Sequence, residues 1–175
     1  MKPDQCFKKN AVLLLGAILL LLPVLTGEPA AAATKRFVAT DQTVKDVKTG
    51  LEWSRDANPA GRSLSWDAAA DYVRMLNKQK YAGHADWRIP EIGELVKLWD
   101  AAKEAGGADA LAGGDFVTML TGLGFLHVQD GDYWSSSASL YNESDAWFMS
   151  MKQGVKSSGN KSLYLSVWPV RFEKK

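Results

Sequence analysis

The placement of the tryptophans and the single cysteine constrains the fold more than any other feature of the sequence. All seven tryptophans lie between Trp53 and Trp168, whereas the only cysteine is Cys6. A domain that begins after the first 33 residues therefore has no disulfide and must be stabilised by packing alone, which a chain of this size can achieve. Because buried aromatic side chains dominate core energetics, we expect a tryptophan-rich core. Whether one or two tryptophans bind a ligand at the surface stays open.

The N-terminal segment has the pattern of a secretory signal peptide. Lysines precede an uncharged apolar run from Ala11 to Leu25, and small residues up to Ala33 follow it. This order favours export and cleavage after Ala33. The run is shorter than the roughly 20 apolar residues of a membrane span, although an uncleaved anchor is an alternative. Cys6 precedes the run, which argues against lipid attachment. We predict a signal peptide at residues 1–33 and one periplasmic, cell-surface or secreted domain at residues 34–175.

Positive and negative charges are nearly equal in number over the whole chain, but they are unevenly distributed along the sequence. The sequence has 21 Lys and Arg against 20 Asp and Glu, which is too weak a basic bias for a nucleic-acid-binding protein. Residues 151–175 are the exception, and a basic face there could bind an anionic glycan or a lipid surface. We favour the alternative that the lysines protect a strand edge. The basic residues of this segment are Lys152, Lys156, Lys161, Arg171, Lys174 and Lys175.

Hydrophobic periodicity in the first half of the domain predicts strands followed by two helices. Ser65 is a suitable N-cap, and Ala69, Val73 and Leu76 recur at helical spacing behind it. The pattern predicts short strands at residues 37–38, 43–44 and 51–53, helices at 63–80 and 91–103, a Gly/Ala-rich loop at 104–115, and a short helix or turn at 116–127.

The last third of the chain is predicted to be an antiparallel sheet. Apolar and polar residues alternate around Trp147, and Gln153-Gly154 and Gly159-Asn160 are typical of hairpin turns. We expect alternation in a final strand from Tyr164 to Val170, with an edge or a bulge at Pro169. Two early helices and a late hairpin sheet predict a single α+β domain.

Six short blocks of sequence occur in an order that resembles a known family. The blocks are VKTGLEW, SWDAAADYVRMLN, YAGHADWRIPEIGELVKL, YWSSSAS, AWFMSMKQGVKSS and SVWPVR. Together they resemble the DUF1566 family, also called the Lcl C-terminal domain after a collagen-like adhesin of Legionella, from Thr40 to Phe172. The resemblance implies a C-type-lectin-like fold, distantly akin to the domain of formylglycine-generating enzymes. Family members often pair a cysteine in the first helix with one in the last strand, where this chain has Val73 and Pro169.

The resemblance also implies that the stretch HADWRIPEIGELVKLWD is a structural joint. In such a fold Trp87 fills the gap between helices and sheet, and Arg88 hydrogen-bonds loop carbonyls with its fixed donors. Pro90 suits a helix start, and Glu94 is expected on the outer face of the helix that follows. The functional alternative for Arg88 is an anion ligand or a transition-state clamp.

Reactive groups are scarce, and we expect neither catalysis nor a cofactor. Formylglycine chemistry needs a cysteine pair that the domain lacks, and His84 and His127 show no zinc-binding spacing. No nucleophile elbow surrounds the serines at 135–137. Asp130 and Asp132 are weak candidates for calcium ligands, since no full calcium loop surrounds them.

A binding site needs an exposed aromatic side chain with polar neighbours. For Trp134 and Trp147 burial in the sheet is the favoured alternative, whereas Tyr141 and Asn142 suit a surface contact. We expect an exported, non-catalytic binding or adhesion module. The Legionella relative suggests an anionic polysaccharide; an envelope scaffold or protein-partner domain is the main alternative, a hydrolase a lesser one, and the oligomeric state stays open. The candidate ligand-binding residues are Trp134, Tyr141, Asn142, Glu143, Lys152, Lys156 and Lys161.

Overall fold

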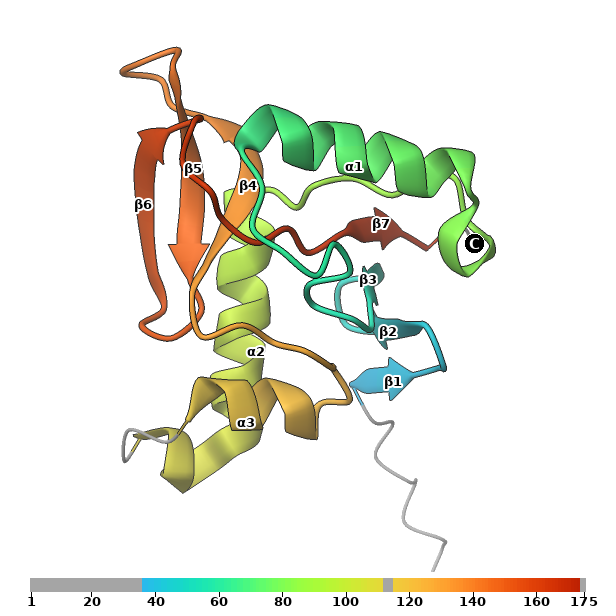
Figure 1. Cartoon of the computed structure of the whole chain (residues 1–175). Coiled ribbons are helices and arrows are strands. Elements are labelled where there is room, and N and C mark those ends of the chain that lie inside the picture. Colours follow the sequence, from blue (N-terminus) through green and yellow to red (C-terminus); the bar gives the residue numbers. More distant parts are fainter. Residues whose placement is uncertain (1–35, 112–114, 174–175) are drawn as a thin grey trace, which may run out of the picture. The chain divides into compact units, whose positions relative to one another are not determined.

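The computed structural model describes residues 36–111 and 115–173, and the predicted signal peptide lies outside them. Within these two ranges, no helix has both the length and the apolar character to cross a membrane. The described chain is an α+β structure with two antiparallel sheets, which confirms the predicted fold class (Figure 1).

The first sheet combines the start of the domain with its end. Its strands lie in the order β1-β2-β3-β7, and every neighbouring pair is antiparallel. Gly50, with a φ of +70°, turns the chain between β2 and β3, a conformation that glycine adopts without strain. The three early strands confirm the sequence prediction. The bounds are β1 Phe37–Ala39, β2 Thr43–Asp46, β3 Leu51–Ser54 and β7 Val170–Phe172.

The second sheet has the order β4-β5-β6, with β6 at its edge. Gly154 lies in the turn between β5 and β6, as predicted, with a φ of +68°. The second predicted turn was misplaced, because Gly159 and Asn160 still belong to β6 and pair with β5. The predicted alternation from Tyr164 to Val170 was also wrong, since Val167 and Trp168 are both fully buried. The bounds are β4 Asp132–Ala138, β5 Asp145–Ser150 and β6 Val155–Asn160.

In the described part of the chain, three α-helices connect the two sheets. Ser65 caps α1 by accepting a hydrogen bond from the Ala68 N–H, and Asp115 caps α3 in the same way through Val117. The predicted loop at 104–115 was wrong over its first part, because α2 continues to Leu111. Alanine, leucine and glutamate are strong helix formers and favour the helix there. Each glycine disfavours it by about 1 kcal/mol relative to alanine, which is not enough to end the helix. The bounds are α1 Trp66–Lys78, α2 Ile92–Leu111 and α3 Phe116–Gly122, with a 3₁₀ turn at Tyr81–Gly83.

Strand β4 contributes to two separate hydrophobic clusters. Tyr133 belongs to the cluster that includes α2, α3 and the first sheet, whereas Trp134 belongs to the cluster beneath α1. Successive residues of a strand point to opposite faces, so both faces of the second sheet are covered at this strand. Trp53, Trp134 and Trp168 are fully buried, in agreement with the predicted aromatic core.

Candidate functional site

The joint around Trp87 brings α1 and the first sheet together. The Asn77 side chain donates to the Trp87 carbonyl and accepts from its N–H, at 2.8 and 2.7 Å. The Trp87 indole is buried and donates to the Tyr81 carbonyl at 2.9 Å. Arg88 then exchanges two backbone hydrogen bonds with Val170 of β7, each 2.9 Å long. The segment therefore lies against α1 on one side and β7 on the other.

Arg88 and Glu94 differ from their predicted roles. Arg88 donates to both carboxylate oxygens of Glu94 at 2.6 Å, and the expected bond to a loop carbonyl is present only as a longer contact of 3.5 Å with Ile89. Glu94 was expected on the outer face of its helix but is only 9% exposed. Burial alone would raise the pKa of Glu94, yet hydrogen bonds from Arg88 and from the Glu91 N–H hold that pKa below its usual value. The ion pair fixes the start of α2 to the joint.

A groove of about 330 Å³ lies between α1 and this joint, and we call it the α1 groove. Its floor is mainly apolar, and Arg74, Glu91 and Ser136 add polar groups. The Ser136 hydroxyl donates to the Pro90 carbonyl, so its lone pairs stay available to a ligand. The lining residues are Trp66, Ala70, Val73, Arg74, Asn77, Trp87, Arg88, Ile89, Glu91 and Ser136.

Trp66 is the aromatic residue at one end of the α1 groove. Its indole N–H donates to the Ser135 carbonyl at 2.8 Å, which fixes the ring while leaving it half-buried. The Lys161 ammonium lies 4.8 Å from the centre of this ring. Sequence reasoning assigned Trp66 only to the apolar face of its helix. Its place at the first helical position, behind the cap Ser65, was the available signal that the ring lies at the helix end.

Four of the predicted ligand-binding residues lie at one end of the second sheet, and one of them, Lys161, lies over Trp66. Tyr141, Asn142 and Glu143 are exposed in the loop between β4 and β5. Lys161, just after β6, donates through its ammonium to the Glu143 carbonyl at 2.7 Å and through its backbone N–H to Ser144 at 2.9 Å. The two loops are therefore joined at the same end of the second sheet.

The other predicted lysines lie away from this end. In the β5–β6 register, Asp145 pairs with Asn160 at one end, and Ser150 with Val155 at the other. Lys152 follows Ser150 in the turn at the far end and binds Asp130 at 2.8 Å. Five residue steps of about 3.3 Å separate the two ends by roughly 17 Å.

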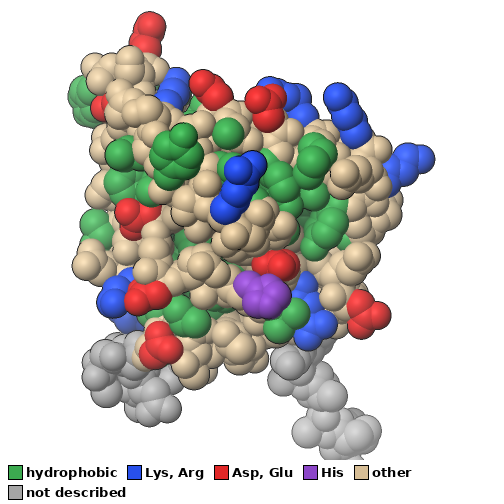
Figure 2. All heavy atoms as spheres, viewed as in Figure 1, with side chains coloured by type: hydrophobic (Ala, Val, Ile, Leu, Met, Phe, Trp, Pro, Cys, Tyr) green, Lys and Arg blue, Asp and Glu red, His purple; other side chains and the backbone are tan. Residues whose placement is uncertain are grey.

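The basic residues of the last segment do not form one face. Lys156 lies on the edge strand β6, as the edge-protection alternative expects. Arg171 is buried and binds the carboxylates of Glu52 and Asp86. Lys174 and Lys175 lie outside the described residues. On the face that Figure 2 shows, lysine and arginine side chains are scattered among acidic and apolar ones.

The two tryptophans considered for ligand contact lie in the second sheet. Trp134 is fully buried, and its indole N–H donates to the Leu64 carbonyl at 2.8 Å, so its assignment to a surface site is corrected. Trp147 is half-buried on β5. Burial of Trp134 was the alternative favoured from the sequence.

The two candidate metal ligands lie in different settings. Asp130 binds Lys152, and Asp132 begins β4, where its carbonyl accepts the Ser166 N–H. His127 lies 2.9 Å from Asp56. Within the described ranges no three His, Cys, Asp or Glu side chains are grouped closely enough to hold a metal ion.

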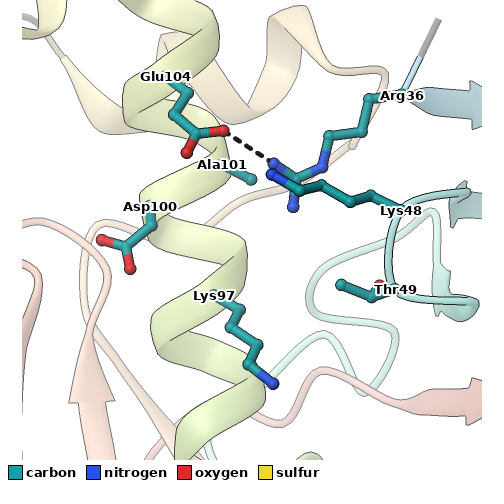
Figure 3. Close-up of a pocket in the computed structure, with 7 residues that line it drawn as sticks. All are labelled: Arg36, Lys48, Thr49, Lys97, Asp100, Ala101 and Glu104. Atoms are coloured by element: carbon teal, nitrogen blue, oxygen red, sulfur yellow. Dashed lines mark hydrogen bonds and ion pairs between the residues drawn. The ribbon is translucent and has the colours of Figure 1, made fainter. Parts of the chain in front are cut away.

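A charged cavity of about 330 Å³ lies between α2 and the first sheet (Figure 3). Arg36 donates to both oxygens of Asp46 and to Glu104, all at 3.0 Å. In Figure 3 the Lys48 side chain extends toward Arg36, whereas Asp100 points away from both. Because Arg36 is neutralised by two carboxylates, this cavity is an ion-pair network, and the α1 groove is the better candidate for a ligand site.

Comparison with known proteins identifies the family. The family model described as the Lcl C-terminal domain matches residues 42–171, which include the α1 groove and both joined loops. A search of curated proteins finds no match to the chain. The match spans most of the chain and confirms the resemblance of the six sequence blocks. The chain belongs to the Lcl C-terminal domain family.

Proposed function

We propose that this protein is an exported, non-catalytic binding module that recognises a glycan in the α1 groove. The observation that carries the proposal is the composition of the groove, in which a half-buried Trp66 and an apolar floor are combined with a few polar groups. Small-ligand sites have this combination, and the apolar face of a sugar ring can stack on an indole while polar groups bind its hydroxyls.

The polar groups of the groove suit hydroxyl recognition. Glu91 is exposed at the start of α2, and Arg74 is exposed on α1 beside its ion-pair partner Asp71. Ser136 on β4 offers an acceptor in the same groove. We therefore assign the hydroxyl contacts of the glycan to these three side chains.

The same residues support a role without catalysis. Glycoside hydrolysis uses two carboxyl groups that face each other across the substrate. Among the described residues that line the groove, Glu91 is the only acidic one. The nearby Glu94 carboxylate is held by Arg88, so it is a poor proton donor or nucleophile.

Charge contributes little to the proposed recognition. Two arginines line the groove, and each has a carboxylate partner: Arg88 is paired with Glu94, and Arg74 with Asp71. Lys161 lies over Trp66, whereas Lys152 lies at the other end of the second sheet. An anionic polysaccharide remains within the proposed ligand class, with ring stacking as the main source of affinity. We expect its binding to weaken only modestly between low and physiological salt.

A glycan array with neutral and sulfated oligosaccharides, followed by calorimetry on the strongest binder, tests this proposal. We expect Trp66→Ala to reduce affinity at least tenfold and Glu91→Gln to reduce it several-fold. Lys78→Ala, an exposed change on the same helix, is the control and should bind like the natural protein. Absence of binding to every oligosaccharide, or binding that Trp66→Ala leaves unchanged, contradicts the proposal.

A further inference from the structure

Two loops at one end of the second sheet carry the same three residues. Ser139-Leu140-Tyr141 lies between β4 and β5, and Ser162-Leu163-Tyr164 follows β6. The exposed fractions are 95% for Leu140, 94% for Tyr141, 43% for Leu163 and 73% for Tyr164. We call these four side chains the Leu-Tyr surface. The β4–β5 loop protrudes from the molecule at the upper left of Figure 1.

Hydrogen bonds within the loops hold the Leu-Tyr surface outward. The Tyr141 N–H donates to the Ser139 hydroxyl at 3.2 Å, and the Ser162 N–H donates to the Asn160 side chain at 2.9 Å. The bonds from Lys161 to Glu143 and Ser144 join the loops to each other. Loop backbones held in this way need less additional ordering when the surface becomes buried.

We propose that the Leu-Tyr surface is a contact between two copies of this chain. Taking about 150–250 Å² for a whole aromatic side chain, the four side chains expose on the order of 500 Å² per copy, or about 1,000 Å² in a symmetric pair. A specific protein–protein interface begins at about 1,000 Å² in total. The surface is therefore large enough for self-association.

The charges beside the Leu-Tyr surface are self-complementary. A two-fold symmetric interface places one patch against itself, so that each group meets its counterpart on the other copy. Glu143 and Lys161 are neighbours, because the Lys161 ammonium binds the Glu143 carbonyl, and they carry opposite charges. A two-fold axis through the loops brings each of them opposite the other on the second copy, which gives two ion pairs.

Self-association has a consequence for the α1 groove, which rests on the proposed function. Lys161 lies over Trp66, so the interface lies beside the end of the groove. Pairing two copies then places two grooves where one polymeric glycan can span both. Binding of the second groove becomes intramolecular, which raises avidity for long chains and leaves affinity for short oligosaccharides unchanged.

Sedimentation equilibrium over a range of protein concentrations tests the interface without any glycan. We expect a concentration-dependent dimer for the natural protein, and a monomer at the same concentrations for the double variant Leu140→Ser, Tyr141→Ser. Val155→Ser is the matched control, because Val155 is 51% exposed at the other end of β6 and should leave the dimer intact. Circular dichroism of each variant checks that the fold is retained.

Charge reversal gives an independent test of the symmetry. Glu143→Lys alone and Lys161→Glu alone should each weaken the dimer, because like charges then face each other. An equimolar mixture of these two variants should form a dimer with one copy of each. Any of three results overturns the proposal. The natural protein could be monomeric at every concentration, the dimer could persist in the Leu140/Tyr141 variant, or the mixture of the two charge variants could fail to associate. Co-sedimentation of the monomer with phosphatidylcholine vesicles also overturns it, because the surface then binds lipid.

Discussion

Arg88 and Glu94 form a bidentate ion pair that connects the segment after α1 to the start of α2. Glu94 also accepts the Glu91 N–H at 2.8 Å, so one carboxylate both caps a helix and holds a guanidinium. Arg88 lies over the Phe172 ring at 4.8 Å, and its backbone pairs with Val170. The pair therefore connects α2 to the last strand of the first sheet.

Removing the carboxylate from this pair should destabilise the protein. Glu94→Ala leaves Arg88 without its partner and the Glu91 N–H without its acceptor, and we expect a loss of about 2 kcal/mol in the free energy of unfolding. Urea denaturation followed by tryptophan fluorescence measures it. Asp71→Ala breaks the exposed Arg74 pair and should cost less than about 0.5 kcal/mol, and an equal loss in both variants would contradict the assigned role.

Acid should destabilise the fold partly through Asp46. Burial alone would raise the pKa of Asp46, but hydrogen bonds from Arg36 and from the Lys48 N–H hold it below the usual 3.8. A carboxyl whose pKa is lower when folded contributes stability above its unfolded pKa, and that stability is lost as pH falls through the folded value. We expect Asp46→Asn to be less stable at neutral pH, with a shallower loss of stability below about pH 4.

Unfolding free energies measured from neutral pH down to about pH 3 check this expectation, since the two curves should approach each other at the acid end. Asp41→Asn, an exposed change in the turn before β2, controls for removal of one surface carboxyl. Parallel curves for the natural protein and Asp46→Asn would show that Asp46 has no part in the acid response.

Asn77 should contribute more to the stability of the fold than its half-buried position suggests. Asn77→Ala leaves both the N–H and the carbonyl of Trp87 without their partner, and an unpaired buried polar group costs about 1–3 kcal/mol. We expect a drop of several degrees in the melting temperature, measured by circular dichroism. Lys78→Ala, the next residue on α1, is the control and should melt with the natural protein.

Gly154 should tolerate no side chain. A Cβ at this position would lie 2.3 Å from the Trp99 ring, and the φ of +68° is strained for other residues. Trp99 cannot easily move, because its ring stacks on Phe116 at 4.3 Å and its N–H binds the Met151 carbonyl at 3.2 Å. We expect Gly154→Ala to cost at least about 2 kcal/mol in chemical denaturation.

Gly131 supplies the comparison for this prediction. A Cβ at Gly131 would meet no atom within 4 Å, and the φ of this residue is not positive, so Gly131→Ala should change stability little. Equal effects of the two substitutions would show that the contact with Trp99 is unimportant.

Local signals in the sequence were sufficient for the early strands and for the first helix. The cap Ser65 and the spacing of Ala69, Val73 and Leu76 predicted α1, because a helix start and an apolar stripe are both encoded within a few residues. The prediction for the final segment, residues 164–170, failed because the local pattern there was misleading. Val167 and Trp168 pass between both sheets, and burial on all sides removes the alternation that marks a half-exposed strand.

The candidate site depended on contacts that no local pattern encodes. Glu143 and Lys161 are brought together by the pairing of β5 with β6, whereas Lys152 is carried to the other end by the same register. Arg88 lies within hydrogen-bonding distance of Glu94 only because α2 begins between the two residues. Trp66 reaches the groove rim because its N–H binds Ser135, 69 residues away in the sequence.

The position of β4 between two hydrophobic clusters has a consequence for how the molecule comes apart. Tyr133 belongs to one cluster and Trp134 to the other, so detachment of this strand exposes both clusters to water. Melting should consequently be all-or-none, and a truncated polypeptide ending ahead of Asp132 should collapse without acquiring a defined tertiary structure.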